Sequence, residues 1–217
     1  MTKKIQIALI LAVSLFFISY SSSSSSDAET TENKIPPLEI YIVDQETMPK
    51  DAGVPNTSYT ASVFVIDNEK KQVFGPFKGS SYPNSRETEP GSDKPNTVDT
   101  GIHLFNNEYG HKGGTVKGLN LINQEEQRKT DGYSWTKKPT TMSYVNLHQG
   151  YSDLGNYNSR GSLGCITIQP DEVGQFWSHF DFSINGTKGT SNGVVYVFRE
   201  SEEKREQLIN EIKNVYQ

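Results

Sequence analysis

The chain alternates short apolar segments with polar turns, and this pattern limits its fold more strongly than any other feature. Leu38 to Val43 and Ser58 to Ile66 are rich in β-branched and aromatic residues, which favour strands. The polar run Asp67 to Lys71 predicts a turn, after which Gln72 to Lys78 returns as a hairpin partner. Further strands are predicted over residues 101–105, 115–122, 143–148, 165–168 and 193–199.

Two other segments are typical of helices. Residues 170–180 start with Pro170 and two acidic residues, which suit the first turn of a helix. Residues 201–215 carry apolar side chains at helical spacing, and Ser201 is expected to cap their start. Residues 79–99 are rich in Pro, Ser, Asn and Asp, which predicts a long irregular loop. Many short strands and two helices predict a mainly β domain.

The amino terminus has the pattern of a secretory signal peptide. Lys3 and Lys4 precede the apolar run Ile5 to Tyr20, which is shorter than the roughly 20 residues that span a bilayer comfortably. We therefore expect a signal peptide with a serine tract over residues 1–26, a flexible lead-in over 27–36 and a folded domain over 37–217. The expected location is the periplasm or cell envelope, without stable membrane insertion after cleavage. An uncleaved amino-terminal anchor is the alternative.

Charge and cysteine content exclude several classes of protein. The formal net charge is −5, so the basic surface that nucleic-acid binding needs is not expected. The mean hydropathy of −0.63 excludes a protein with many membrane spans. A single cysteine excludes both an intramolecular disulfide framework and a cysteine-rich zinc module.

That cysteine, Cys165, is the leading candidate for chemistry. A free thiol with a pKa of about 8.5 is mostly protonated at neutral pH, so a nucleophilic cysteine needs a base. His148 ends one predicted strand and Cys165 starts another. If these strands are antiparallel neighbours, the two side chains meet at one edge of the sheet, where the imidazole would take the proton and hold an ion pair. The alternative is an inert cysteine, buried by alternation with Ile166 and Ile168.

The segment around Cys165 resembles a known catalytic motif. Ser162-Leu163-Gly164-Cys165-Ile166, with His148 seventeen positions before the cysteine and Gly150 close after that histidine, is similar to the L,D-transpeptidase catalytic domain. In that family a His is followed by a loop of this size, then by Ser/Thr-x-Gly-Cys and an apolar residue. The resemblance covers residues 146–170.

The resemblance implies a fold, an activity and a role for each matching residue. It implies an L,D-transpeptidase-like β-sandwich, with a short helix after the cysteine strand and a C-terminal helix, acting on peptidoglycan stem peptides without metal or cofactor. Cys165 would be the nucleophile and His148 the base. The supporting residues are Ser162, Leu163 and Gly164 for the oxyanion, and Gln149, Gly150 and Arg160 for the substrate.

The chain also departs from the family pattern. Leu163 stands where the family often has His, and Thr167 stands where it often has Arg. Arg160 is the candidate replacement, because its planar guanidinium suits a carboxylate, although an exposed loop arginine is equally expected. The same machinery also fits an L,D-carboxypeptidase or amidase. A catalytically silent binding or structural module on this fold is the alternative from a different class.

The remaining histidines do not indicate a metal site. His103, His111 and His179 lack the spacing of a zinc motif. Other cysteine enzymes fit less well. Papain-like and NlpC/P60-like peptidases place the cysteine before the histidine, whereas sortases place the histidine much farther from a Thr-x-Thr-Cys element.

Overall fold

The computed structural model describes residues 35–48, 55, 57–83, 96–134, 136–151 and 161–217. The chain divides into two compact units, Met1–Pro36 and Pro37–Gln217, and the second contains nearly all of the described residues. The predicted signal peptide, residues 27–34 of the predicted lead-in and residues 84–95 of the predicted loop lie outside the described residues.

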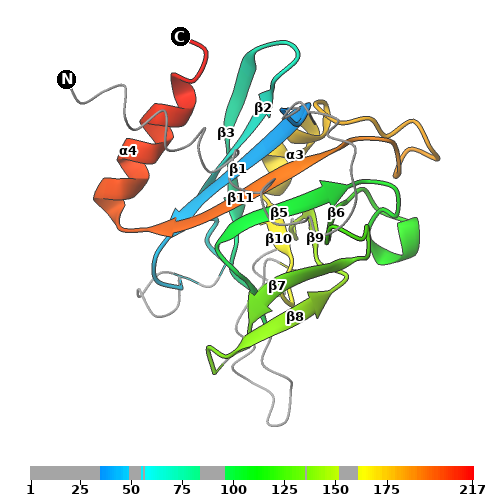
Figure 1. Cartoon of the computed structure of the whole chain (residues 1–217), viewed down its shortest axis with the longest axis horizontal. Coiled ribbons are helices and arrows are strands. Elements are labelled where there is room, and N and C mark those ends of the chain that lie inside the picture. Colours follow the sequence, from blue (N-terminus) through cyan, green and yellow to red (C-terminus); the bar gives the residue numbers. More distant parts are fainter. Residues whose placement is uncertain (1–34, 49–54, 56, 84–95, 135, 152–160) are drawn as a thin grey trace, which may run out of the picture. The chain divides into compact units, whose positions relative to one another are not determined.

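The larger sheet of Pro37–Gln217 is a closed barrel of eight strands (Figure 1). Its strands, in spatial order, are β1 (Leu38–Gln45), β11 (Asn192–Glu200), β5 (Gly101–Asn106), β6 (Leu119–Ile122), β9 (Asn146–Gln149), β10 (Ile166–Ile168), β3 (Gln72–Ser80) and β2 (Ala61–Asp67). A smaller sheet consists of β4 (Thr97–Val98), β7 (Lys129–Tyr133) and β8 (Pro139–Ser143). The helices are the 3-10 turn η1 (Lys112–Gly114), α3 (Pro170–Trp177) and α4 (Glu202–Lys213).

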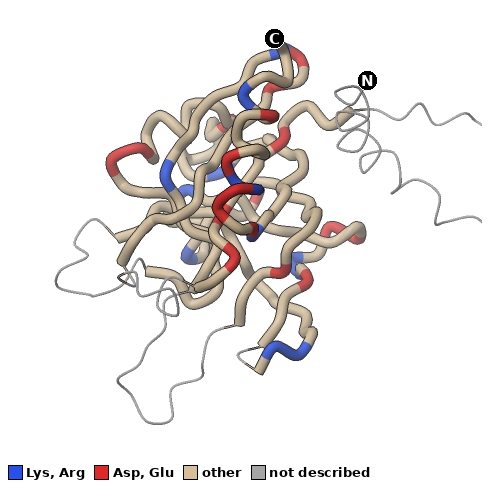
Figure 2. The backbone as a smooth tube through the Cα atoms, turned by 90° about the vertical axis from the view of Figure 1, so that its left-hand side faces the viewer, with Lys and Arg blue, Asp and Glu red and all other residues tan. Residues whose placement is uncertain are grey.

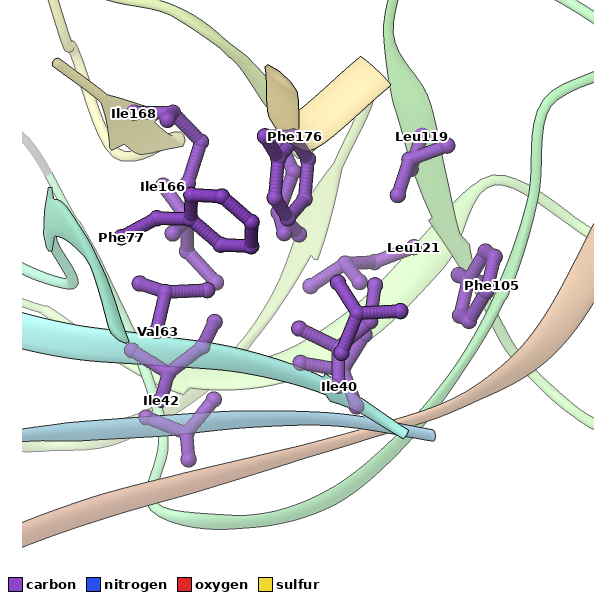
Figure 3. Packing of buried hydrophobic residues seen from close by; sticks show 14 of the residues in the cluster. Ile40, Ile42, Val63, Phe77, Phe105, Leu119, Leu121, Ile166, Ile168 and Phe176 are labelled. Carbon is purple, nitrogen blue, oxygen red and sulfur yellow. The ribbon is translucent and has the colours of Figure 1, made fainter. Parts of the chain in front are cut away.

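Alternation along the strands fills the barrel interior with apolar side chains. Successive residues of a strand point to opposite faces, so every second residue faces the interior. Figure 3 shows this packing, in which Ile42 and Val63 approach Ile166 and Ile168 across the core. Helix α3 adds Phe176 to the same cluster. The core therefore holds the strand that follows Cys165 in a fixed position.

The outer face of β1, β2 and β11 carries a second apolar cluster. Tyr41, Phe64 and Tyr196 alternate with the inward-facing residues of these strands. Ile212 of α4 is 1% exposed and packs against them, so α4 covers this side of the barrel. Figure 1 shows α4 beside β1 and β11. The apolar face predicted for a helix over residues 201–215 thus packs on the sheet.

The structure confirms the mainly β class and both predicted helices. The sandwich arrangement is not confirmed, because the larger sheet closes on itself. Ser201 lies at the start of α4 as predicted, but its side chain makes no capping hydrogen bond.

Several strand boundaries differ from the prediction for local reasons. The segment 115–122 forms a strand only from Leu119, because the turn η1 and its flanks occupy the preceding residues. The segment 143–148 is broken because Tyr144 has a φ of +61°, which ends β8 before β9 begins. Strands β4, β7 and β8 were not predicted, since their sequences lack a run of apolar residues.

Replacing Ile42 by alanine is expected to lower the free energy of unfolding by about 2–5 kcal/mol, because it leaves a cavity in the core. Ile42 is fully buried, whereas Ile184 is 47% exposed and provides a matched control. Ile184→Ala should change stability by less than about 0.5 kcal/mol. Urea denaturation followed by circular dichroism measures both, and equal losses would contradict the position of Ile42 in the core.

Candidate functional site

His148 lies in strand β9, and Cys165 directly precedes the neighbouring strand β10. Strands β9 and β10 are parallel, with Leu147 opposite Ile166 and His148 opposite Thr167. The antiparallel pairing considered from the sequence is therefore wrong, and residues 150–165 form a parallel connection, which needs about a dozen residues or more. His148 lies opposite Thr167, which is two residues after Cys165. This offset and the spacing between strands together separate the Cα atoms of His148 and Cys165 by roughly 8 Å.

The side chain of Cys165 faces away from the barrel core. Ile166 and Ile168 belong to the core cluster, whereas Cys165 does not and is partly buried. Continued one residue back from β10, the alternation of the strand places Cys165 on the same outer face as Thr167, and therefore as His148. Cys165 is thus not packed in the apolar core beside Ile166 and Ile168. Within the described residues, however, no hydrogen bond joins the thiol to the imidazole.

The orientation of His148 is fixed by its own strand end. The ring is buried, and its Nδ1 donates a hydrogen bond to the backbone carbonyl of Gln149 over 2.7 Å. A carbonyl oxygen only accepts, so the proton is on Nδ1 and Nε2 keeps its lone pair. A neutral His148 can therefore accept a proton at Nε2.

A second histidine completes a stacked pair. The rings of His111 and His148 lie 4.1 Å apart with an angle of 5° between their planes. Asn146 Nδ2 donates to His111 Nδ1 over 3.1 Å, so His111 is also held as a neutral ring. His111 was not predicted as a site residue, because the loop that carries it lies far from the motif in the chain.

Asn146 connects the two histidines and the cysteine. Its carbonyl oxygen accepts a hydrogen bond from Asn120, and its amide donates to the Tyr144 carbonyl over 2.8 Å. The backbone and the side chain of Asn146 also lie close enough to Cys165 to lower the pKa of its thiol. The strand register extends these polar contacts into a row of paired asparagines across the outer face, formed by Asn192, Asn106, Asn120 and Asn146. Cys165 follows at the end of this row, one residue before the pair of Leu147 and Ile166.

One arginine lies beside Asn146. Arg128 Nη2 is 3.5 Å from Asn146 Oδ1, and its guanidinium carbon lies 5.2 Å from the ring centre of Tyr109 and 4.8 Å from that of Tyr144. The two tyrosines hold the planar group by cation–π contact. The sequence gave no signal for Arg128, since it precedes a strand that was not predicted.

Burial keeps the thiol and both imidazoles neutral at rest. Desolvation raises the pKa of the Cys165 thiol, and the hydrogen bonds from Asn146 and the charge of Arg128 only partly oppose it. Desolvation lowers the pKa of His148, and it lowers the pKa of His111 to about 4 with help from His148, Lys112 and Arg128. The ion pair expected from the sequence is therefore disfavoured in the resting protein.

The turn before Cys165 is shaped by a serine and a glycine. The buried Ser162 hydroxyl donates to the Cys165 carbonyl and accepts the Gly164 N–H over 3.2 Å. Gly164 has a φ of +130°, and a Cβ there would meet the Asn96 carbonyl oxygen at 2.8 Å. Only glycine fits this position. The Gly164 N–H, predicted as an oxyanion donor, is engaged with Ser162 in this conformation, whereas Leu163 is 62% exposed.

The predicted substrate-contacting residues lie in different places. Gln149 ends β9 with an exposed side chain, and the Gly150 N–H donates to the Ile168 carbonyl over 2.9 Å. Arg160 lies outside the described residues. A hollow of about 380 Å³ lies between Lys78, Tyr151 and Gln169, and neither Cys165 nor His148 lines it. We therefore assign the candidate site to the polar outer face around Cys165 and not to this hollow.

His103 and His179 lie apart from this group. His103 hydrogen-bonds to Thr130 over 2.7 Å, and His179 stacks on Phe74 with ring centres 4.0 Å apart. Among the residues that the structure describes, no group of three or more His, Cys, Asp or Glu side chains could hold a metal ion. None of the helices in those residues is long and apolar enough to cross a membrane.

Comparison with known proteins adds no relative. No family model, no curated protein and no solved structure matches the chain. The candidate site therefore rests on the motif and on its geometry.

Replacing Asn146 by alanine is expected to raise the pKa of Cys165 further, because it removes the side-chain contribution that favours the thiolate. The rate of alkylation by iodoacetamide against pH reports this directly, since Cys165 is the chain's single cysteine. Asn192→Ala, at the exposed end of the same row, is the control and should leave the midpoint unchanged. An unshifted midpoint in Asn146→Ala would contradict the assignment.

Proposed function

We propose that this chain is an exported, L,D-transpeptidase-like cysteine acyltransferase of the periplasm or cell envelope, acting on peptidoglycan stem peptides. Cys165 is the nucleophile and His148 is the base. The proposal includes the L,D-transpeptidase-like sandwich, since opposite walls of a closed sheet face each other across one core, as two packed sheets do.

One observation carries the proposal. His148 lies in β9 and Cys165, spaced as in the resembling motif, directly precedes the adjacent parallel strand β10, with the proton of His148 on Nδ1. A histidine held in this tautomer presents Nε2 as a general base. The buried core on the other side of β9 and β10 keeps both strands rigid, which preserves the geometry of the pair.

The first half of the reaction forms a thioester. His148 Nε2 accepts the thiol proton while Cys165 Sγ attacks the carbonyl carbon of a stem-peptide amide. Because both groups are neutral at rest, proton transfer accompanies the attack and does not precede it. Backbone N–H groups of the turn 162–165 stabilise the oxyanion, and the Gly164 N–H joins them only when it leaves the Ser162 hydroxyl. The protonated His148 then gives its proton to the leaving amine, and the C–N bond breaks.

The second half releases the acyl group. An acceptor amine attacks the thioester carbonyl while His148 accepts a proton from the amine, and the Cys165 thiolate leaves and is reprotonated. Water in place of the amine makes the same site an L,D-carboxypeptidase or amidase. No metal or organic cofactor takes part.

A catalytically silent cell-envelope binding or structural module is the second candidate. The raised pKa of Cys165 and the missing hydrogen bond to His148 favour it within the described residues. Such a module would bind stem peptides without forming a thioester.

Incubation with muropeptides is expected to give a wild-type chain whose mass is increased by an acyl group on Cys165, together with transferred or hydrolysed peptide products. Cys165→Ala should give neither. Intact-protein mass spectrometry and analysis of the muropeptides measure the two effects. Product mixtures that are the same for wild type and Cys165→Ala would remove the proposed activity.

His148→Ala is expected to slow acylation of Cys165 by about 10²–10⁴-fold, since a general base contributes that much. His179→Ala is the matched control, because His179 stacks on Phe74 away from the site. The pKa of His148 is lowered by burial, so the base stays neutral and active as the pH falls to 6.5 and fails only below it. The pKa of Cys165 is raised, so the rate should stay level up to about pH 9. An acid limb that persists in His148→Ala would contradict the assignment of the base.

A further inference from the structure

Arg128 is a cation without an acidic partner in the described part of an acidic chain. The sequence has 26 acidic and 21 basic residues, and Figure 2 shows both kinds interspersed along the described trace. The ion pairs found among the described residues join Lys70 to Asp67 and Lys204 to Glu200, so none of them involves Arg128. Its Nε is buried and has no hydrogen-bond partner there. A buried guanidinium N–H without a partner is costly, which indicates a group still to be bound.

The guanidinium is held in place before any ligand arrives. Tyr109 and Tyr144 contact it by cation–π interaction, and the Tyr144 N–H donates to the Arg128 carbonyl over 3.0 Å. Tyr144 adopts a φ of +61°, which is strained for a bulky residue, and the residue as a whole is 66% exposed. Strain of this kind is concentrated at functional sites. The tyrosines therefore fix a planar fork of donors at the surface.

In space, the side chain of Asn146 lies between Arg128 and the candidate nucleophile Cys165. The contact of Arg128 Nη2 with Asn146 Oδ1, at 3.5 Å, is at the outer limit of a hydrogen bond. Both Asn146 and the charge of Arg128 act on the thiol of Cys165, where they lower its pKa. The charges that act on the thiol and the two imidazoles come from Arg128 and Lys112, both positive. Within the described residues the site is thus locally positive, and it favours an anionic group next to the attacked carbonyl.

We infer that Arg128, clamped between Tyr109 and Tyr144, binds a carboxylate of the peptide beside the bond that Cys165 attacks. A carboxylate matches the paired N–H groups of an arginine fork, whereas a carboxamide has one acceptor oxygen and no charge. The role expected for Arg160 from the sequence is here given to a different residue. This inference rests on the proposed function for the identity of the peptide.

The test measures binding in the full chain carrying Cys165→Ala, so that no reaction is needed. The ligands are a stem peptide with a free C-terminal carboxylate and the same peptide as a carboxamide, titrated by calorimetry. Amidation is expected to weaken binding on the order of 10- to 100-fold with Arg128 present, and to have little effect in Arg128→Gln. Arg128→Lys keeps the charge without the fork and should be intermediate. Lys129→Gln, a neighbouring exposed cation, is the control and should behave like the parent.

Two outcomes would overturn the inference. One is an equal effect of amidation with and without Arg128, and the other is no binding of the carboxylate peptide to the parent. The proposed function fails separately, when wild type forms no thioester on Cys165 although its Cys165→Ala variant binds the carboxylate peptide through Arg128. A circular dichroism spectrum shows whether Arg128→Gln is folded. If it is not, the comparison is made with Arg128→Lys instead.

Discussion

The parallel pairing of β9 with β10 determines the arrangement of the whole candidate site. The register that puts Leu147 opposite Ile166 directs both into the core, and it therefore directs Asn146, His148 and Cys165 outward together. A slip by one residue would exchange the two sets, placing polar side chains in the core. The apolar packing shown in Figure 3 thus fixes the outward direction of His148 and Asn146, although these side chains are not part of the core cluster.

The closed sheet has two outer faces with different chemistry. On one side Tyr41, Phe64 and Tyr196 are covered by α4. On the other side a row of asparagines runs across neighbouring strands toward Cys165, and Asn120 and Asn146 are almost fully buried there. Buried amides need partners, and these supply them to one another, to Gly110 and to His111. A neutral hydrogen-bonded layer of this kind supports reactive groups without adding charge beside them.

The sequence predicted those features that depend on local pattern. The β-branched segment at Leu38 and the helix after Pro170 follow directly from composition and spacing. The pairing of Cys165 with His148 came from the motif, and the structure brings them to one face. The relative direction of β9 and β10 could not be predicted, because the connection over residues 150–165 is long enough for either parallel or antiparallel strands. His111 and Arg128 were missed for a physical reason: they reach the site through folding of distant loops, and no spacing in the chain marks such contacts.

The stacked imidazoles of His111 and His148 have a consequence for charge. Two rings 4.1 Å apart in a desolvated position repel each other strongly when both are protonated, and each therefore suppresses ionisation of the other. Burial keeps both rings neutral at rest, and protonation of one ring opposes protonation of the other. In the proposed reaction, His111 therefore stays neutral while His148 carries the thiol proton. The stack limits this buried position to the charge of one proton at a time.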